Sequence, residues 1–313
     1  MLRFLLRRLL SLLFIAIAVP TIVFFVMRMV PADPALVVLG DQATAESLAA
    51  FRAKTGLDQP LLVQYGNFVS DLAHGDLGDS MISGEPILDQ IAAVFPHTLS
   101  LALGALLIGA LVGIPLGVLT AVRRDTWVDF GGRVFALLGF SFPSFYLGVL
   151  LLLVFSVWLG WFPVIHTMRG DSVAEYLNKL ALPALSLGLV QAAYVTRLTR
   201  STMLEVLNQD YIRTAFAKGL TGRKVYYKHA LRNVLITVVT AMGLYTGTIL
   251  GGAILTETVF NRPGLGKLLI GAIAQRDYNL IQSGLIVFAL VIMVVNLIVD
   301  LSYSLLDPRV KHA

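Results

Sequence analysis

The sequence predicts an all-α membrane protein with six transmembrane helices and with both termini in the cytoplasm. Of its 313 residues, 57% are hydrophobic and only 14% are charged, and long apolar runs recur along the chain. Soluble globular proteins carry about 25% charged residues because their surface faces water. The shortage of charge therefore indicates a surface that faces lipid. The sequence contains no cysteine, which excludes a disulfide framework and a thiolate metal site.

Six segments are apolar enough to cross a hydrocarbon core of about 30 Å, which takes about 20 helical residues. They are residues 9–30, 98–122, 134–160, 180–196, 235–256 and 281–305. The fourth is the weakest, because it is short and carries Gln191 and Tyr194. The first follows three arginines and contains a small-residue stretch that resembles a signal-peptidase site. Its apolar run continues to Val30, so we expect an uncleaved first helix.

The distribution of lysine and arginine predicts the direction of these helices. With the N-terminus in the cytoplasm, most of the 24 basic residues fall on cytoplasmic segments, and eight of them lie within residues 197–233. Residues 31–97 show the reverse bias, because their acidic residues outnumber Arg52 and Lys54. The net charge of +5 is therefore explained by orientation in the membrane, and we expect no nucleic-acid partner.

The long segment between the first two predicted helices is expected to form a small extracytoplasmic cap, residues 31–97. Residues 44–54 predict a short helix that Gly56 ends, residues 60–73 predict another, and a turn-rich stretch follows at 74–80. We expect one transmembrane domain over residues 1–313, with this cap outside and a polar loop, residues 197–233, in the cytoplasm.

Two predicted helices carry glycine at every fourth residue, and small residues let membrane helices approach closely. These glycines are Gly109, Gly113 and Gly117 in the second helix and Gly243, Gly247 and Gly251 in the fifth. We favour packing within the bundle. Contact with a partner subunit, or room for a translocation path, is the alternative.

Ionisable groups are nearly absent from the predicted spans; Glu257 and Asp300 lie close to the two membrane faces. Ion-coupled transporters commonly place acids or histidines at mid-membrane as relays, so their absence disfavours a secondary transporter. An intramembrane enzyme would need paired acids, a Ser/His set or metal ligands within the helices, and the sequence offers none. Glu257 is either a pore-mouth residue or the partner of a nearby arginine, and Asp300 is expected to be structural.

The cytoplasmic loop contains one short amphipathic segment. Asp210 is expected to cap a helix that runs to Lys218, and Gly219 stands where such a helix would end. Ile212, Phe216 and Leu220 recur at every fourth residue and predict one apolar stripe. Such a helix suits either a groove on a partner protein or the surface of an anionic membrane.

Several ordered motifs resemble one family. Asp210-Tyr211-Ile212-Arg213-Thr214-Ala215-Phe216-Ala217-Lys218-Gly219-Leu220, followed by His229-Ala230-Leu231-Arg232-Asn233, resembles the coupling loop of binding-protein-dependent ATP-binding cassette (ABC) importer permeases. The similarity is closest to the first, B-type, permease subunit of the dipeptide, oligopeptide, nickel and glutathione branch. Further matches occur at residues 30–34, 56–60, 74–78, 254–260, 263–266, 276–278, 300–303 and 307–309. Phe216 replaces a usual Arg, and Thr237 replaces a usual Pro.

The resemblance implies a type I ABC importer transmembrane domain in the bacterial inner membrane. It implies a second homologous permease subunit, two cytoplasmic ATPase subunits that bind ATP and Mg, and an extracytoplasmic solute-binding protein. By the same resemblance the ATPase contact falls on Asp210, Tyr211, Arg213, Thr214, Ala215, Phe216, Lys218, Gly219 and Leu220. The cap, with Pro263, Gly264 and Gly266, would meet the binding protein, or the cap would only plug the outer face. The expected solute is a di- or oligopeptide, with nickel, glutathione and sugars left open.

We expect no ATPase site or metal site in this chain. Gly266-Lys267 is the Gly-Lys pair that could end a phosphate-binding loop, but Leu268 follows it where Ser or Thr is required. Asn261 stands at the position of the first glycine of such a loop. The histidines do not cluster into a ligand set. The energy for transport must therefore come from a partner.

Overall fold

The computed structural model describes residues 2–29, 33–40, 43–164 and 172–306, and side chains are described for residues 10–298 within these ranges. This part of the chain is helical and contains no β-strand; its one extended pairing is the isolated bridge between Asp79 and Pro86. The all-α prediction is confirmed. The motif at residues 307–309 and the side chain of Asp300 lie outside what the structure describes.

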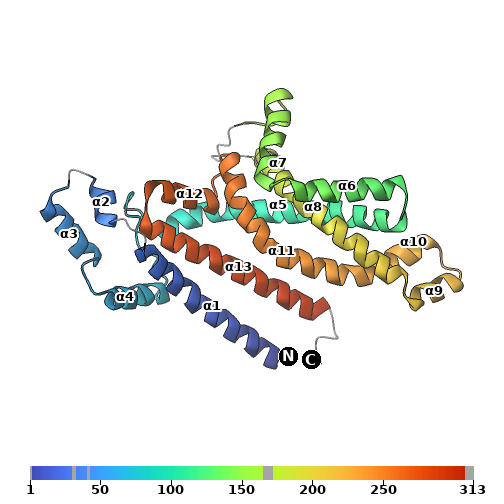
Figure 1. The fold of residues 1–313 in the computed structure, drawn as a ribbon, viewed down its shortest axis with the longest axis horizontal. Helices are drawn as coiled ribbons and strands as arrows, with labels where there is room; N and C mark the ends of the chain where they lie inside the picture. The colour runs from blue at the N-terminus through green and yellow to red at the C-terminus, as the bar shows by residue number, and fades with distance from the viewer. Residues whose placement is uncertain (1, 30–32, 41–42, 165–171, 307–313) are drawn as a thin grey trace. The chain divides into compact units, whose positions relative to one another are not determined.

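In the described part of the chain, five helices are long and apolar enough to cross a membrane, and a bent pair of helices brings the number to six if the pair is counted as one span. The five are α1 (Leu2–Met29), α5 (Ile87–Val122), α8 (Val173–Leu207), α11 (Leu231–Val259) and α13 (Tyr278–Leu306) (Figure 1). The sixth joins α6 (Trp127–Ser141) to α7 (Ser144–Leu151) and its π-helical continuation η1 (Leu152–Trp158). Five of the predicted spans are thus present as single helices, and the region of the predicted third span is this bent pair.

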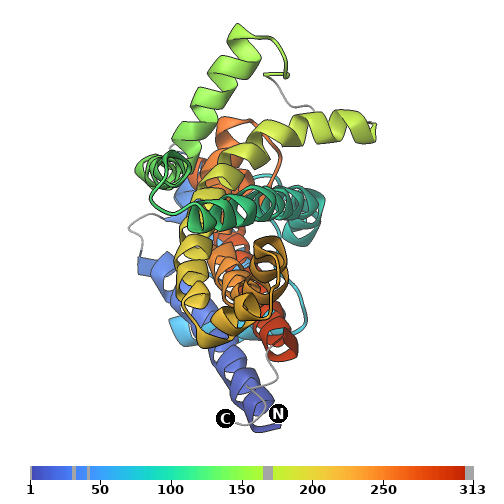
Figure 2. The same cartoon turned by 90° about the vertical axis from the view of Figure 1, so that its right-hand side faces the viewer.

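The third span is broken, where the sequence predicted one continuous helix with a tolerated kink at Pro143. The two halves meet at an angle of 103° (Figure 2). Pro143 has no amide hydrogen to donate and forces the preceding residue out of the helical conformation. Phe142 accordingly adopts an extended conformation, with φ −109° and ψ 129°. The span also begins earlier than predicted, at Trp127.

The predicted cytoplasmic loop is mostly helix. Helix α8 continues to Leu207, a short helix α9 (Asp210–Ala217) follows, and α10 (Gly222–Lys224) with η2 (Val225–Ala230) leads directly into α11. The apolar run ends at the membrane face, but polar and basic residues sustain a helix in water equally well. Thr237 lies inside α11, so the replacement of Pro there does not mark the start of the fifth span.

The chain divides into two compact units, and we describe each by itself. Unit 1 comprises Met1–Pro96 and Gly264–Met293, and unit 2 comprises His97–Pro263 and Val294–Ala313. Helix α5 belongs to unit 1 up to Pro96 and to unit 2 from His97, and α13 belongs to unit 1 up to Met293 and to unit 2 from Val294. The organisation as one permease domain stays a prediction.

Unit 1 holds the two predicted cap helices, α3 (Ala45–Thr55) and α4 (Leu61–Ala73), and a short helix that was not predicted, α2 (Pro34–Leu39). The Thr44 side chain caps α3 by accepting the Ser47 amide hydrogen at 3.2 Å. Gly56 ends the helix with φ +68°, as predicted. Helix α4 packs on α1, where the fully buried Phe24 ring lies 5.3 Å from the Tyr65 ring.

The turn-rich segment after α4 is hydrogen-bonded to the start of α13, also within unit 1. The buried Asp277 carboxylate accepts hydrogen bonds from the Ser80 hydroxyl and from the Met81 amide. Asn279 donates to the Asp79 carbonyl oxygen at 3.1 Å, and Ser283 donates to that of Leu77 at 2.9 Å. Two of the sequence motifs, residues 74–78 and 276–278, are therefore brought together by tertiary structure. The short apolar helix α12 (Leu265–Gln275) precedes this contact.

In unit 2, helices α5 and α8 approach closely through the glycines of α5. A Cβ atom added at Gly109 would lie 2.3 Å from the Gln191 Cγ atom, and one at Gly117 would lie 2.4 Å from the Thr199 Cβ atom. Neither distance can accommodate a side chain. The preferred interpretation, packing within the bundle, is therefore confirmed for the glycines of α5.

Helix α8 is the centre of unit 2. It contacts α6, α7 and α11 as well as α5, and 61% of its apolar window is buried, the largest share among the five single-helix spans. Its modest hydropathy follows from this position, because a helix that faces protein does not need a lipid-like surface. Gln191, which weakened the prediction of this span, is fully buried.

We expect Gly113→Ala to lower the free energy of unfolding by about 1–3 kcal/mol, the cost of overpacking a close-packed interface. The added Cβ atom would lie 2.8 Å from the Ala192 carbonyl oxygen, which belongs to the backbone of α8 and cannot move aside. Thermal unfolding of the purified protein in detergent measures the effect.

The matched control is Gly131→Ala in α6, where an added Cβ atom meets nothing within 4 Å. This variant should unfold at the wild-type temperature or slightly above it, since alanine favours a helix over glycine. Equal stability of the two variants would contradict the close α5–α8 contact.

Candidate functional site

The predicted cytoplasmic helix forms as α9, but it begins differently. Gln209 is the residue at the N-cap position, and its side chain makes no capping hydrogen bond. Asp210 is instead the first residue of the helix, where a carboxylate still interacts favourably with the positive end of the helix dipole. Its side chain is 96% exposed and lies 3.5 Å from the Arg213 guanidinium. The capping role predicted for Asp210 is therefore wrong.

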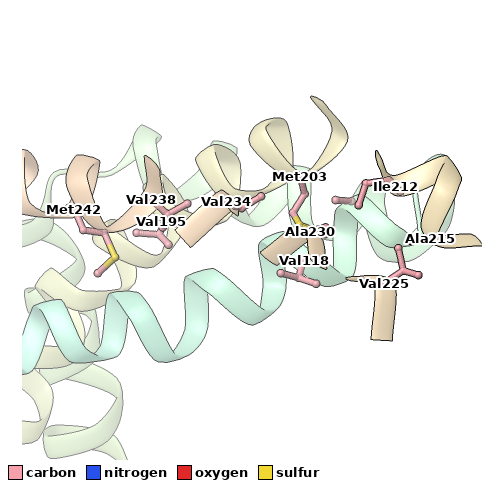
Figure 3. Packing of buried hydrophobic residues seen from close by; sticks show 11 residues of the cluster. Val118, Val195, Met203, Ile212, Ala215, Val225, Ala230, Val234, Val238 and Met242 are labelled. Carbon is pink, nitrogen blue, oxygen red and sulfur yellow. The ribbon is translucent and has the colours of Figure 1, made fainter. Parts of the chain in front are cut away.

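One face of α9 is anchored in unit 2. Ile212 is 1% exposed and Ala215 is 7% exposed, and both belong to the apolar cluster drawn in Figure 3. The cluster contains Met203 of α8 and the last turns of α5; its members are Val118, Ala121, Val195, Met203, Ile212, Ala215, Val225, Ala230, Val234, Val238 and Met242. The spans α5, α8 and α11 thus share one apolar core with α9.

The predicted apolar stripe is only partly correct. Ile212 points inward, but Phe216 is 43% exposed and meets the Tyr226 ring edge-on at 6.2 Å. Leu220 is half-buried against the same cluster. The buried residues of α9 are Ile212 and Ala215, three residues on, whereas Phe216, four residues on and still within the helix, contacts the Tyr226 ring instead of the core. Ala215 contacts the core of its own chain.

The opposite face of α9 is exposed and polar. It presents the side chains of Asp210, Tyr211, Arg213, Thr214, Phe216 and Lys218. The Tyr211 hydroxyl accepts a hydrogen bond from the Asn233 side chain of α11 at 2.8 Å, which ties α9 to a second predicted motif. Gly219 follows with φ +80°, a conformation that other residues rarely adopt, and leaves open space around its Cα atom.

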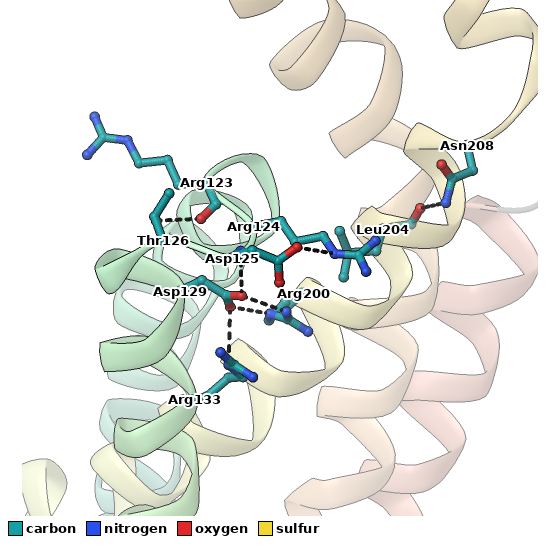
Figure 4. Close-up of polar contacts among 9 residues, drawn as sticks. All are labelled: Arg123, Arg124, Asp125, Thr126, Asp129, Arg133, Arg200, Leu204 and Asn208. Atoms are coloured by element: carbon teal, nitrogen blue, oxygen red, sulfur yellow. Dashed lines mark hydrogen bonds and ion pairs between the residues drawn. The ribbon is translucent and has the colours of Figure 1, made fainter.

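The same unit contains an ion pair that the sequence did not predict, between a buried carboxylate and a partly buried guanidinium. Asp129, in the first turn of α6, is fully buried, and Arg200 of α8 donates two hydrogen bonds to its carboxylate at 2.6 and 2.9 Å (Figure 4). The two residues are 71 positions apart, so no local pattern connects them. Removing one member of a buried pair typically costs about 3–5 kcal/mol, because the other charge is left uncompensated.

Gly251 of α11 behaves differently from the glycines of α5. Gly251 is exposed, and a Cβ atom added there would meet nothing within 4 Å, while Gly243 and Gly247 are half-buried. Gly251 lines an apolar groove of about 550 Å³ beside the break between α6 and α7, with Tyr245 and Leu255 from the same helix. In unit 2 the exposed α11 glycine is therefore not used for packing.

Glu257 lies inside unit 2 and is fully buried. Its carboxylate accepts a hydrogen bond from the Thr98 hydroxyl at 2.6 Å and interacts electrostatically with the buried Arg262. Arg262 in turn donates to the Tyr176 hydroxyl at 2.9 Å. This environment favours the alternative in which Glu257 interacts with an arginine over the pore-mouth alternative.

The residues predicted to meet the binding protein differ in exposure. Pro263 is half-buried, and Gly264 and Gly266 are buried at the start of α12, where Gly264 is the N-cap residue. Among the described residues no group of three or more His, Asp or Glu could hold a metal ion.

Two family models match the chain. The one described as the binding-protein-dependent transport system inner membrane component matches residues 113–312. The other, described as the N-terminal part of the membrane component of these systems, matches residues 1–102.

The chain is similar over its full length to several transport proteins. It is 40% identical to the dipeptide transport system permease protein DppB of Alkalihalophilus pseudofirmus, with 100% of both chains covered. It is 42% identical to the glutathione transport system permease protein GsiC of Salmonella choleraesuis, again with 100% of both covered. It is 40% identical to the di/tripeptide transport system permease protein DppB of Pseudomonas aeruginosa, with 100% of this chain and 99% of the relative covered.

A solved structure of the MetNI methionine ABC transporter, in an inward-facing conformation, contains a chain of similar fold. The TM-score is 0.57 and the identity is 19%, with 71% of this chain and 99% of that chain covered. At this identity the likeness shows the fold alone.

We expect Ile212→Ala to loosen α9, because the shortened side chain leaves a cavity in the shared core at a cost of about 2–5 kcal/mol. Amide hydrogen exchange should become faster across Asp210–Ala217, while exchange in the middle of α5 stays unchanged. The control is Phe216→Ala, whose half-exposed ring should contribute much less. Equal exchange in both variants would show that α9 is not anchored through Ile212.

Proposed function

Because the chain belongs to the family of inner membrane components of binding-protein-dependent transport systems, we propose that it carries small peptides across the membrane. The chain is a multi-pass permease subunit of an ABC importer in the inner membrane, and not an enzyme in its own right. The solute, the partner contacts and the roles of single residues are the parts that we propose.

A peptide solute is supported by the names of the similar proteins. The relatives named above transport a dipeptide, di- and tripeptides, or glutathione, which is itself a tripeptide. The identities of 40% and 42% do not separate these solutes. We propose di- or oligopeptides as the solute class, with glutathione as the alternative within it.

The partner set follows from the family. A binding-protein-dependent importer requires a solute-binding protein outside and ATPase subunits inside. We propose two ATPase subunits that bind ATP and Mg, and a second homologous permease subunit that supplies the remaining spans of the pore. The exposed Gly251 and the groove beside it support a partner helix or the solute path on this face of α11.

Helix α9 is proposed to be the contact with an ATPase subunit. The observation that carries this role is the division of α9 into two faces, one buried in the core that joins α5, α8 and α11, the other exposed and charged. A force on the exposed face is passed to all three spans through Ile212 and Ala215. We assign the ATPase contact to Asp210, Tyr211, Arg213, Thr214, Phe216 and Lys218, and anchoring to Ala215 and Leu220.

On the outside, the cap (residues 31–97) is proposed to meet the binding protein, and a contact with the same protein is proposed for Pro263. Gly264 and Gly266 are buried, so their proposed role is to shape the start of α12 beneath that contact. The acidic cap would attract a binding protein that presents basic residues.

We expect Gly219→Val to abolish the ATP hydrolysis that solute and binding protein stimulate in the assembled complex. The substitution strains a backbone with φ +80° directly after α9 and so displaces the proposed ATPase contact. Membrane insertion should be unchanged. Gly160→Val is the matched control, since Gly160 has φ +64°, is equally open, and follows η1 instead of α9. Unchanged stimulated hydrolysis in Gly219→Val would refute the coupling role.

Uptake by proteoliposomes tests the solute class. The complex should import a tritiated dipeptide such as glycyl-leucine, or tritiated glutathione, only when ATP and the binding protein are both present. Import of nickel or of a sugar in place of both peptides would overturn the proposed class.

A further inference from the structure

We propose that Asp129 and Arg200 are positioning residues that fix α9 relative to the ends of α5, α6 and α8, so that the motion of α9 reaches the spans. This inference rests on the proposed function of α9. It concerns a side-chain cluster in the same unit as α9, and this cluster takes no part in the ATPase contact itself.

The Asp129 carboxylate is the meeting point of three chain segments (Figure 4). Arg200 of α8 donates from Nε and Nη2, and the Asp125 amide in the α5–α6 turn donates at 3.1 Å. Arg133 of α6 lies 3.7 Å away. Asp125 is held in the left-handed region, with φ +61°, so the turn after α5 is closed on the same carboxylate.

The pair lies close in the chain to the anchor of α9. Arg200 precedes Met203 by one helical turn, and Met203 packs in the cluster that holds Ile212 and Ala215. The turn held by Asp129 directly follows the last residues of α5, and Val118 and Ala121 of that helix belong to the same cluster. Helix α9 therefore packs in one apolar cluster with the ends of α5 and α8, and the ion pair joins α8 to the first turn of α6, directly after α5.

The pair is not needed to bring α5 and α8 together, because the glycines of α5 already do so along the length of the two helices. The ion pair lies only at one end of these helices, the end that the distribution of lysine and arginine predicts to be cytoplasmic. A bidentate arginine–carboxylate pair fixes the orientation of the two helices that it joins as well as the distance between them. Apolar packing at Ile212 and Ala215 does not fix orientation in this way. Its expected effect is on coupling more than on folding.

This role can be tested by measuring the amount of peptide imported per ATP hydrolysed. The measurement uses proteoliposomes that contain the assembled complex, with tritiated glycyl-leucine or glutathione as the probe. We expect D129N to lower the peptide imported per ATP hydrolysed about five- to tenfold, the range of a moderate coupling free energy. ATP hydrolysis itself should persist. R133Q is the matched control, since Arg133 faces the same carboxylate from 3.7 Å and is 54% exposed; it should change the ratio less than about twofold.

Two further variants separate coupling from stability. D129N/R200Q removes both charges, so no uncompensated buried charge remains, and it should fold even if D129N does not. R200K keeps the charge but cannot form the bidentate contact, and it should lie between wild type and D129N. If the double variant regains the wild-type ratio of import to hydrolysis, the pair is only structural and the proposal is wrong.

A second measurement does not depend on transport. The chain has no cysteine, so spin labels can be placed at R124C and A217C, two exposed positions in the α5–α6 turn and at the end of α9. We expect one narrow distance distribution in the wild-type background and in R133Q, and a broad one in D129N/R200Q. An equally narrow distribution in the double variant would overturn the positioning role. Loss of ATP-driven uptake in the wild type would overturn the proposed function instead.

Discussion

The close approach of α5 and α8 is the contact on which unit 2 depends. Lipid tails are as apolar as leucine, so no hydrophobic force drives two membrane helices together, and only close packing and polar contacts hold them. Glycine at Gly109, Gly113 and Gly117 removes the side chains that would separate the two backbones. Because α8 is fixed in this way on one side, its other sides are free to receive α6, α7 and α11.

Polar contacts complete this arrangement at both ends of the helices. At one end Glu257 accepts from Thr98 of α5, and Arg262 donates to Tyr176 of α8. At the other end Arg200 binds Asp129. Such groups are expensive to bury, and each of these three has a hydrogen-bond partner on another helix. The bundle is therefore held together along its length and at its two ends.

Much of the fold could be predicted from local patterns. The apolar runs located six spans, and the cap helix at Ala45–Thr55 was predictable because its capping residues, Thr44 and Gly56, flank it in the sequence. The boundaries were less predictable, because the end of an apolar run marks the membrane face and not the end of a helix. Hence α8 and the helix that begins at Gly222 extend far beyond their predicted spans. Pro143 divides the third span, which the hydropathy of the sequence predicted to be one continuous helix.

The sequence by itself determined that the chain is a membrane protein, which way its charges orient it, and that a short helix beside Gly219 is its distinctive cytoplasmic feature. These properties depend on residue type and spacing within one segment. Only the tertiary structure decided that Ala215 faces the core of its own chain, that Glu257 is buried, and that Asp129 meets Arg200. Each of these depends on which helices become neighbours, and contacts between residues 71 or 159 positions apart leave no periodic signal in the chain.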